Sequence, residues 1–433
     1  MIPQSTPKRR GLVSLFLLSL WAWRSPAAPL PVPSGLFVSS GSGRASAPVV
    51  TGRTMNIRQH TPKVTLNWDS FDIAAGHTVN FQQPSSSATA LNLIHDANPS
   101  LIQGRLRANG EVWLLNQNGI VFGRGAEVNV RGLLASTLSP TADALSTGLA
   151  PQSAQAYTGP ALSGAATGEV RLAPGASITT NGESGRVFLF APTVTNQGSI
   201  TATDGQVALA AGTEIFSRQP EEGGGSGLIV EVGHGGIVTN GAKGNAGQRD
   251  PAALLGQVVA DRGTATLVGL SVNQLGRVSA SSAVRAGGTV RLLARSSVQG
   301  SAPGETLPSA GGQVLLGQRS VTSVTPDAGD DALAVDARTP QTGRLEAVGK
   351  QITLAANSLV QAHGGAVRMS VNDQGNELLE LVDAGASSQS RITMANGSRI
   401  DVDNSSIGGL QRNGCVDSRL KILTGARTGF VTR

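Results

Sequence analysis

The chain is poor in cysteine, aromatic residues and charged residues. Its 433 residues include a single cysteine, Cys415, so no disulfide can form within the chain. Aromatic residues make up 3% and charged residues 14% of the sequence. An ordinary globular core would therefore have to be built from Val, Leu, Ile and Ala. Together with 56 glycines, this supply favours a stack of thin β-coils, because each layer needs only a few small aliphatic side chains.

Long apolar runs are also scarce, and the clearest one lies at the N-terminus. Three basic residues at 8–10 precede an apolar run at 11–23, which small residues and prolines follow. This is the layout of a secretory signal peptide, and the run is shorter than the roughly 20 residues of a membrane-spanning helix. We predict a signal peptide over residues 1–27 with cleavage after Ala27, the alternative being a retained membrane anchor. No later run approaches spanning length, so we expect no stable membrane span.

Residues 98–137 alternate apolar and polar positions in short bursts. Alternation with a period of two is typical of β-strands. The pairs Asn109-Gly110 and Asn118-Gly119 interrupt it, and both residue types adopt positive φ at little cost. The segment therefore predicts short strands joined by tight turns.

This segment, NPSLIQGRLRANGEVWLLNQNGIVFGRGAEVNVRGLLAST, resembles the secretion domain of filamentous haemagglutinin-like exoproteins of the two-partner secretion pathway. An earlier segment, NIRQHTPKVTLNWDSFDIAAGHTVNFQQP, resembles the opening of the same domain. The usual form of the family's motif is NPNGI, and here Gln117 replaces the proline. That replacement removes one rigid φ angle from the turn.

The resemblance implies a partner and a set of site residues. The partner would be an outer-membrane transporter, a β-barrel with periplasmic docking domains, and the NPNGI motif would be needed for its recognition. The alternative is that the motif residues only form turns. Both hypotheses predict that substitution harms export. The residues concerned are Asn98, Pro99, Asn116, Asn118, Gly119 and Ile120.

Beyond residue 165 a Gly-x-Val pattern recurs, with a spacing near 20 residues and one longer gap. Such a repeat is typical of a solenoid in which each period of the sequence forms one coil. The longer gap predicts a loop insertion between Pro220 and Gln248. An antiparallel sandwich, the alternative all-β fold, would need cleaner hairpins and more aromatic residues. The glycines that open the pattern are Gly168, Gly185, Gly205, Gly256, Gly276 and Gly288.

One repeat shows the expected arrangement within a coil. Stacked coils pair each strand in parallel with its equivalent in the next coil and bury aliphatic ladders. A corner is expected at Asn196 and Gly198. The residues expected to point inward are Val187, Leu189, Val194 and Ile200.

These observations predict an all-β fold, a right-handed parallel β-helix (solenoid) with an N-terminal capped secretion domain. The handedness and the cap follow from the resemblance. Residues 28–52, rich in Pro, Ser and Gly, are expected to form a flexible leader. The remaining divisions are a two-partner secretion (haemagglutination activity) domain at 53–165, β-helix repeats at 166–371, and an irregular C-terminal tail or cap at 372–433.

No pattern predicts catalysis, so we expect no enzyme activity, no catalytic residues, no cofactor and no metal. The Asp residues at 327–336 lack the spacing of a calcium loop. The histidines have no paired spacing for zinc, and no Gly-x-Ser-x-Gly elbow is present. The net charge of +6 comes from scattered basic residues, which predicts a solvated basic surface and no nucleic-acid partner.

The function that follows is that of a secreted or surface-exposed exoprotein that reaches the cell surface through the periplasm. The resemblance implies an adhesin or haemagglutinin that binds a receptor on host cells or other bacteria. Two alternatives remain at this stage. One is a truncated or short carrier related to contact-dependent inhibition toxins, and the other is a polysaccharide-active β-helix enzyme.

Overall fold

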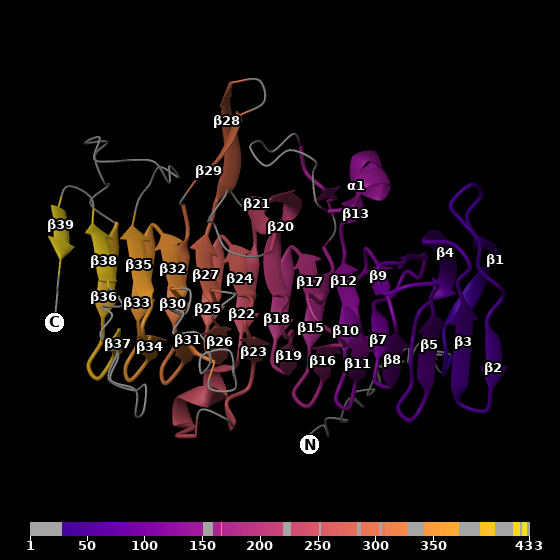
Figure 1. The fold of residues 1–433 in the computed structure, drawn as a ribbon, viewed down its shortest axis with the longest axis horizontal. Coiled ribbons are helices and arrows are strands. Elements are labelled where there is room, and N and C mark those ends of the chain that lie inside the picture. The colour runs from indigo at the N-terminus through magenta and orange to yellow at the C-terminus, as the bar shows by residue number, and fades with distance from the viewer. Residues whose placement is uncertain are drawn as a thin grey trace, which may run out of the picture.

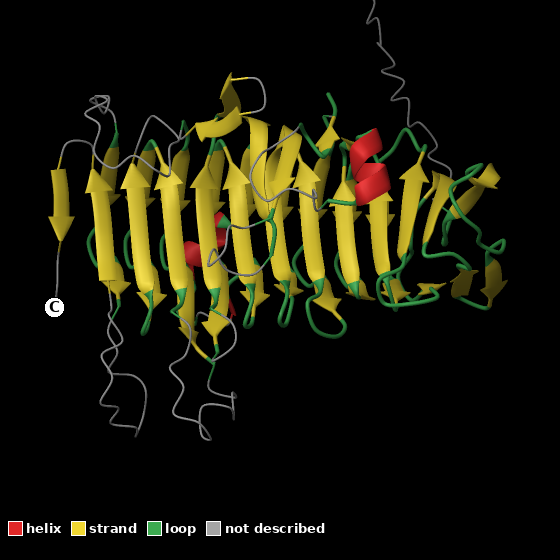
Figure 2. Ribbon diagram, turned by 45° about the horizontal axis from the view of Figure 1, so that its top comes forward, coloured by secondary structure: helices red, strands yellow, loops and turns green. Residues whose placement is uncertain are grey.

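The chain winds into an elongated parallel β-helix whose coils stack along its long axis (Figures 1 and 2). The expected β-solenoid is therefore confirmed. The computed structural model describes residues 28–149, 159–165, 167–219, 227–250, 253–283, 287–302, 305–309, 311–327, 342–371, 390–402, 419–424 and 427–430. The predicted signal peptide with Ala27, Cys415 and most of the 327–336 acidic segment lie outside these residues.

A large sheet of 16 strands forms one side of the β-helix. Its main path consists of β1 (Val32–Val38), β4 (Lys63–Ser70), β6 (Thr89–Ile94), β9 (Glu111–Leu115), β12 (Gly132–Ser136), β17 (Arg186–Ala191), β20 (Gln206–Arg218), β24 (Thr264–Gly269), β27 (Thr289–Ala294), β32 (Arg344–Gly349), β35 (Ala366–Val371), β38 (Arg419–Thr424) and β39 (Arg427–Phe430). Joined to this path are β13 (Ser139–Pro140), β14 (Leu162–Ser163) and β21 (Ile229–Gly235).

Two further sheets complete each coil. The twelve-stranded sheet contains β2 (Val49–Thr51), β3 (Thr54–Arg58), β5 (Thr78–Gln82), β8 (Arg105–Ala108), β11 (Glu127–Val130), β16 (Ser177–Thr180), β19 (Ser199–Thr201), β23 (Gln257–Ala260), β26 (Arg277–Ser282), β31 (Val321–Pro326), β34 (Leu359–Ala362) and β37 (Arg399–Asp401). The nine-stranded sheet contains β7 (Ser100–Ile102), β10 (Ile120–Phe122), β15 (Glu169–Leu172), β18 (Thr193–Asn196), β22 (Ile237–Asn240), β25 (Ser271–Gln274), β30 (Gln313–Leu316), β33 (Gln351–Leu354) and β36 (Arg391–Met394).

Smaller elements project from the coils. They are the short helix α1 (Ala142–Thr147), the 3-10 helix η1 (Lys243–Gly247) and the hairpin of β28 (Ser297–Ala302) and β29 (Glu305–Ser309). Figure 1 shows α1 and the hairpin on the same edge of the molecule and η1 on the opposite edge. None of the helices in the described residues is both long enough and apolar enough to cross a membrane.

The interior consists of aliphatic ladders that run from coil to coil. Along β9, β12, β17 and β20 the in-register residues Val112, Leu133, Val187 and Val207 have at most 2% of their surface exposed. Because equivalent residues meet in register, each coil buries its apolar side chains against nearly identical side chains of the next. The inward positions predicted from the sequence, Val187, Leu189, Val194 and Ile200, are all fully buried.

Buried carboxamides fill one corner of the β-helix. Asn196, Asn240 and Gln274 occupy equivalent positions on β18, β22 and β25. Asn196 Nδ2 donates to Asn240 Oδ1 at 2.8 Å, and Asn240 Nδ2 donates to Gln274 Oε1 at 2.8 Å. Asn196 Oδ1 also accepts from the backbone N–H of Gly198 at 3.0 Å. The expected corner at Asn196 is therefore present, and this amide ladder satisfies polar groups that water cannot reach.

The prediction of a flexible leader at 28–52 is wrong, because these residues form strands. β1 pairs antiparallel with β4, and β2 pairs antiparallel with β3. The rings of Phe37 and Trp68 meet edge to face with centroids 5.1 Å apart. An uncovered first coil would expose its apolar interior, so these residues act as the N-terminal cap of the solenoid.

Two other expectations also need correction. The range 220–248 was expected to be a loop, yet it contains β21, β22 and η1. β20 extends beyond its coil and pairs antiparallel with β21, whose Val230 and Val232 are buried against the apolar outer face of the large sheet.

In the range 372–433, the described strands β36, β37 and β38 continue the three sheets in parallel, and β39 pairs antiparallel with β38. These parts are therefore not irregular.

A buried ion pair fastens the β20–β21 extension to the main body. Arg295 Nε lies 3.1 Å from Glu231 Oε2, and both side chains are 2% exposed. The pair joins β21 to the residue that follows β27. A charge that loses its partner in such a place cannot be solvated, so the pair is costly to break from one side.

We predict that Arg295→Met lowers the free energy of unfolding by about 3–5 kcal/mol, because it leaves the Glu231 carboxylate buried without this partner. The double variant Arg295→Met/Glu231→Met should recover most of the loss. Denaturant unfolding followed by circular dichroism measures both. Arg105→Ala is the control, since Arg105 pairs with Glu127 on the exposed surface and should have little effect. Equal stability of Arg295→Met and the native chain would refute the assignment.

Candidate functional site

The NQNG sequence forms the tight turn between β9 and β10. The backbone N–H of Gly119 donates to the carbonyl of Asn116 at 3.1 Å, which closes a four-residue turn. Gly119 has a φ of +122°, and a Cβ there would lie 3.1 Å from the carbonyl oxygen of Glu169. Glycine is required at this position because of both its backbone conformation and the close approach of the next coil.

Asn116 is the buried support of this turn, with 1% of its surface exposed. Its Nδ2 donates to the carbonyl of Asn98 at 3.1 Å and to Ser100 Oγ at 3.0 Å. Its Oδ1 accepts from the backbone N–H of Asn118 at 2.9 Å. The side chain therefore holds its own turn and ties it to the preceding coil.

A second turn lies directly beside the first. Asp96 Oδ1 accepts from the backbone N–H of Asn98 at 2.8 Å and from Asn98 Nδ2 at 3.0 Å. Asn118 Nδ2 donates to the Asp96 carbonyl at 2.8 Å, and the Ser100 N–H donates to the Gly119 carbonyl at 3.0 Å. We call residues 96–99 and 116–119 the twin turn. All six predicted site residues lie in it or immediately after it.

Exposure divides the predicted residues into two groups. Asn98, Pro99 and Asn118 are exposed, as is Gln117. Asn116, Gly119 and Ile120 are buried, and Ile120 belongs to the aliphatic interior. Only the exposed group can touch a partner, while the buried group shapes the turn.

An open cavity of about 530 Å³ adjoins the twin turn. A second cavity, of about 710 Å³, lies on the same outer face of the large sheet beside α1. Thr65, Leu91 and Leu145 line both, so the two form one apolar groove. The first cavity is lined by Thr65, Leu91, Leu93, Ile94, His95, Asp96, Leu115, Asn116, Gln117, Asn118, Leu138, Ser139, Pro140 and Leu145.

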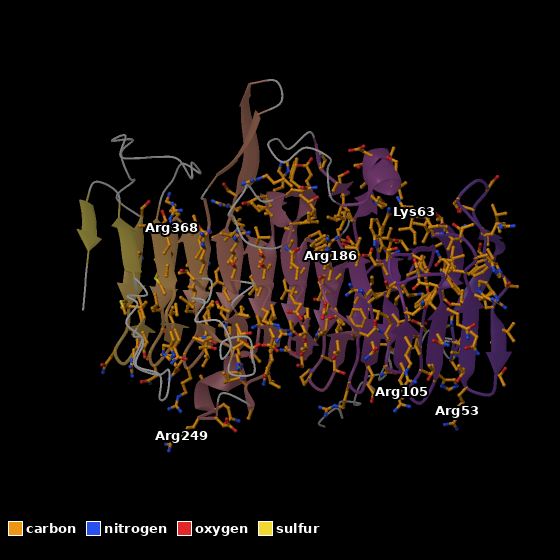
Figure 3. All side chains as sticks on the ribbon, in the orientation of Figure 1. Arg53, Lys63, Arg105, Arg186, Arg249 and Arg368 are labelled. Carbon is orange, nitrogen blue, oxygen red and sulfur yellow. The ribbon has the colours of Figure 1, made fainter. Side chains whose placement is uncertain are left out.

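The groove also carries charged groups along one edge. Burial raises the pKa of the Glu111 carboxyl above its usual value, although Arg186 and Arg131 oppose the shift. Lys63 Nζ donates to the carbonyl of Ser146 at 2.8 Å and so holds the end of α1. Lys63 and Arg186 line the larger cavity together with residues of α1, and Figure 3 shows Lys63 just below α1.

The sequence alone did not indicate that some further residues belong to the site. Asp96 and Ser100 bind the motif directly, and Gln117 Nε2 reaches Ser139 Oγ at 3.1 Å. The spacing of Asp96 and Asn98 is a signal for an Asx turn, but nothing local shows that Asp96 meets Asn118. Within the part of the chain that the structure describes, no three His, Cys, Asp or Glu side chains are grouped to hold a metal ion.

The family model described as the TPS secretion domain matches residues 37–292, more than half of the chain. The chain belongs to the TPS secretion domain family. The match begins before and ends after the range 53–165 that the sequence analysis assigned to this domain. The twin turn lies inside it. Membership in this family makes the protein a two-partner secretion exoprotein, exported through the periplasm to the cell surface or beyond.

Two curated relatives match parts of the chain. A heme/hemopexin-binding protein of Haemophilus influenzae strain Rd is 39% identical over 127 residues, 29% of this chain and 14% of the relative. Another heme/hemopexin-binding protein of Haemophilus influenzae is 44% identical over 95 residues, 22% of this chain and 10% of the relative. The aligned segments thus span a small part of these relatives, whose names describe those whole proteins.

A solved structure has the same fold. The HMW1 secretion domain from Haemophilus influenzae aligns with a TM-score of 0.56 over 84% of this chain and 83% of that chain, at 20% sequence identity. The likeness supports the β-helix at the level of fold. The family match indicates a role in two-partner secretion.

We predict that Asn116→Ala lowers the free energy of unfolding by about 1–3 kcal/mol, because it leaves buried hydrogen-bonding groups without partners. Asn118→Ala should cost less, since its side chain is exposed and makes one hydrogen bond. Thermal unfolding of the two purified variants provides the comparison. A larger loss for Asn118→Ala than for Asn116→Ala would contradict the division into buried and exposed groups.

A separate prediction concerns Gln117, which occupies the second position of the four-residue turn. Proline is favoured there, and no described hydrogen bond uses the Gln117 backbone N–H. We expect Gln117→Pro to raise the free energy of unfolding by about 0.4–1 kcal/mol through a less flexible unfolded chain. Denaturant titration measures the change. Destabilisation would show that φ at Gln117 does not suit proline.

Proposed function

We propose that the exposed face of the twin turn is the surface that the outer-membrane transporter recognises. The single observation that supports this is the exposure of Asn98, Pro99, Gln117 and Asn118 on a turn whose shape buried residues fix. A rigid, preformed turn loses little conformational entropy when a partner binds. Asn116, Gly119 and Ile120 then act indirectly, by holding the recognised shape.

The apolar groove beside the twin turn extends this surface. Leu93, Leu115 and Leu138 line it next to Gln117 and Asn118. An apolar groove with polar groups at its end suits a protein partner, which gains affinity from apolar contacts and orientation from hydrogen bonds. We propose that a periplasmic docking domain of the transporter binds across both.

Export then follows from the order of the chain. We propose that residues 1–27 direct the chain to the periplasm and are removed after Ala27. The coils around the twin turn then form in the periplasm, and the coils that follow them fold after the chain has passed the transporter. At roughly 0.05–0.15 kcal/mol per residue, a coil of about 20 residues gains about 1–3 kcal/mol on stacking. Each coil that has folded outside the cell hinders the chain from sliding back into the periplasm, because that coil would have to unfold first.

At the surface we propose a role in adhesion to host cells or to other bacteria. The β-helix supports this proposal because the outer face of its twelve-stranded sheet presents long, regular rows of polar side chains. Adhesion by such rows needs no catalytic group.

The decisive experiment follows secretion in cells that carry a matching transporter. We predict that Gln117→Ala/Asn118→Ala folds normally by circular dichroism yet stays in the periplasm, with release reduced about tenfold, equivalent to about 1.4 kcal/mol of binding free energy. The matched control is Thr179→Ala/Gln361→Ala, which removes polar side chains from the twelve-stranded sheet.

Three outcomes would overturn the proposal. Normal release of the folded Gln117→Ala/Asn118→Ala variant would show that the exposed residues are not recognised. An equal loss in the control would show a general effect of surface substitution. Appearance of the native protein in the medium without any transporter would remove the need for a partner.

A further inference from the structure

A polar cleft lies on the outer surface of the twelve-stranded sheet, near the N-terminal end of the β-helix. Its volume is about 480 Å³, and carboxamide side chains dominate its lining. Such a lining differs from that of a typical small-molecule pocket, which is mostly apolar. The lining residues are Asn80, Gln82, Gln83, Asn109, Asn129 and Asn181, with Arg107, Phe81 and Ala108.

The β-helix sets the spacing of these groups. Asn80 on β5, Arg107 on β8 and Asn129 on β11 are direct register partners. Neighbouring strands lie about 4.8 Å apart, and alternate side chains point to the same face. The three side chains therefore form a straight row on the solvent side, with Asn181 beside its end.

Hydrogen bonds hold the carboxamides in place before any ligand binds. Asn80 Nδ2 donates to Asn56 Oδ1 at 3.0 Å. Asn181 Nδ2 donates to the Ala108 carbonyl and to Asn129 Oδ1, both at 2.9 Å. Asn109 exchanges hydrogen bonds with the backbone of Gln83 at 2.8 and 2.9 Å. A preorganised array loses little side-chain entropy on binding.

The same bonds leave a defined set of groups for a ligand. The bonded atoms are the Nδ2 of Asn80 and Asn181 and the Oδ1 of Asn129, so the Oδ1 of Asn80 and Asn181 are available acceptors and the Asn129 amide is an available donor. Within the described residues the exposed guanidinium of Arg107 has no hydrogen bond or ion pair, and the Glu127 carboxylate attracts it electrostatically. Its neighbour Arg105 points away from the body of the β-helix (Figure 3) and is occupied by Glu127 at 2.7 Å.

The chemistry of these groups selects one ligand class. Sugar hydroxyls both donate and accept, which matches mixed amide donors and acceptors, and a guanidinium binds a carboxylate or sulfate through two parallel hydrogen bonds. Phe81 is 1% exposed, so it provides no surface for stacking or for an apolar anchor. A single cation is too few for a nucleic-acid backbone, whose binding relies on many phosphate contacts.

We propose that this cleft binds an acidic glycan, with the anionic group on Arg107 and hydroxyls on Asn80, Asn129 and Asn181. The inference rests on the proposed display of the protein at the cell surface, where it would meet such glycans. The carboxylate or sulfate is the shared feature, and the chemistry of the cleft is compatible with either.

Titration calorimetry on the purified protein tests the proposal with three probes: a heparin oligosaccharide, which is sulfated, a hyaluronan oligosaccharide, which is carboxylated, and a neutral maltooligosaccharide. We expect at least one acidic probe to bind and the neutral one to bind much more weakly. Arg107→Ala and Asn129→Ala should each weaken binding about tenfold. Arg171→Ala is the matched control, because Arg171 is an exposed arginine on β15 of the nine-stranded sheet.

Several results would overturn the inference. One is the absence of binding to either acidic probe. Another is an equal loss in Arg107→Ala and Arg171→Ala, which would indicate general attraction to a basic surface. If Arg107→Ala proves unstable, Arg107→Gln keeps a polar side chain of similar length, and unchanged binding by that variant would also refute the site. Secretion of Arg107→Ala should stay normal, so failure here is distinguishable from failure of transporter recognition.

Discussion

Parallel in-register stacking is the constraint on which the rest of this structure depends. Between the terminal strands β1, β2 and β39, the described strands on the main paths of the three large sheets pair in parallel with their equivalents in the next coil, so like residues meet like residues. The interior can then be built from Val, Leu, Ile and Ala, as the ladder of Val112, Leu133, Val187 and Val207 shows. The scarcity of aromatic residues is a consequence of this arrangement, because a thin coil has no room for many large rings.

Stacking also brings polar groups into places that water cannot reach. At the corners, backbone groups turn out of the ladders and need other partners. Buried carboxamides provide them: Asn196, Asn240 and Gln274 bond to one another in a row, and Asn116 does the same work in the twin turn. A residue such as Asn116 can therefore be essential for recognition without touching the partner.

The outer face of the large sheet departs from the usual pattern of a solenoid. Trp113, Leu134, Phe188 and Phe190 point outward and remain buried. The β20–β21 extension covers part of this face, and α1 lies beside another part, where the groove next to the twin turn remains open. In contrast, the outer face of the twelve-stranded sheet is polar and carries the carboxamide cleft. One side of the molecule thus suits a protein partner and the other a hydrophilic ligand.

The sequence by itself determined the repeating architecture and the turns, because alternation, Gly-x-Val spacing and the Asn118-Gly119 pair are local signals that dictate local backbone. The six motif residues also come from two short stretches of the sequence, which the structure places side by side in the twin turn. Only the tertiary structure decided which of them are exposed, since the burial of Asn116 depends on contacts with Asn98 and Ser100 from the preceding coil. The same holds for the N-terminal cap: a Pro-, Ser- and Gly-rich segment has weak local preferences, and its strands exist because the first coil offers edges to pair with.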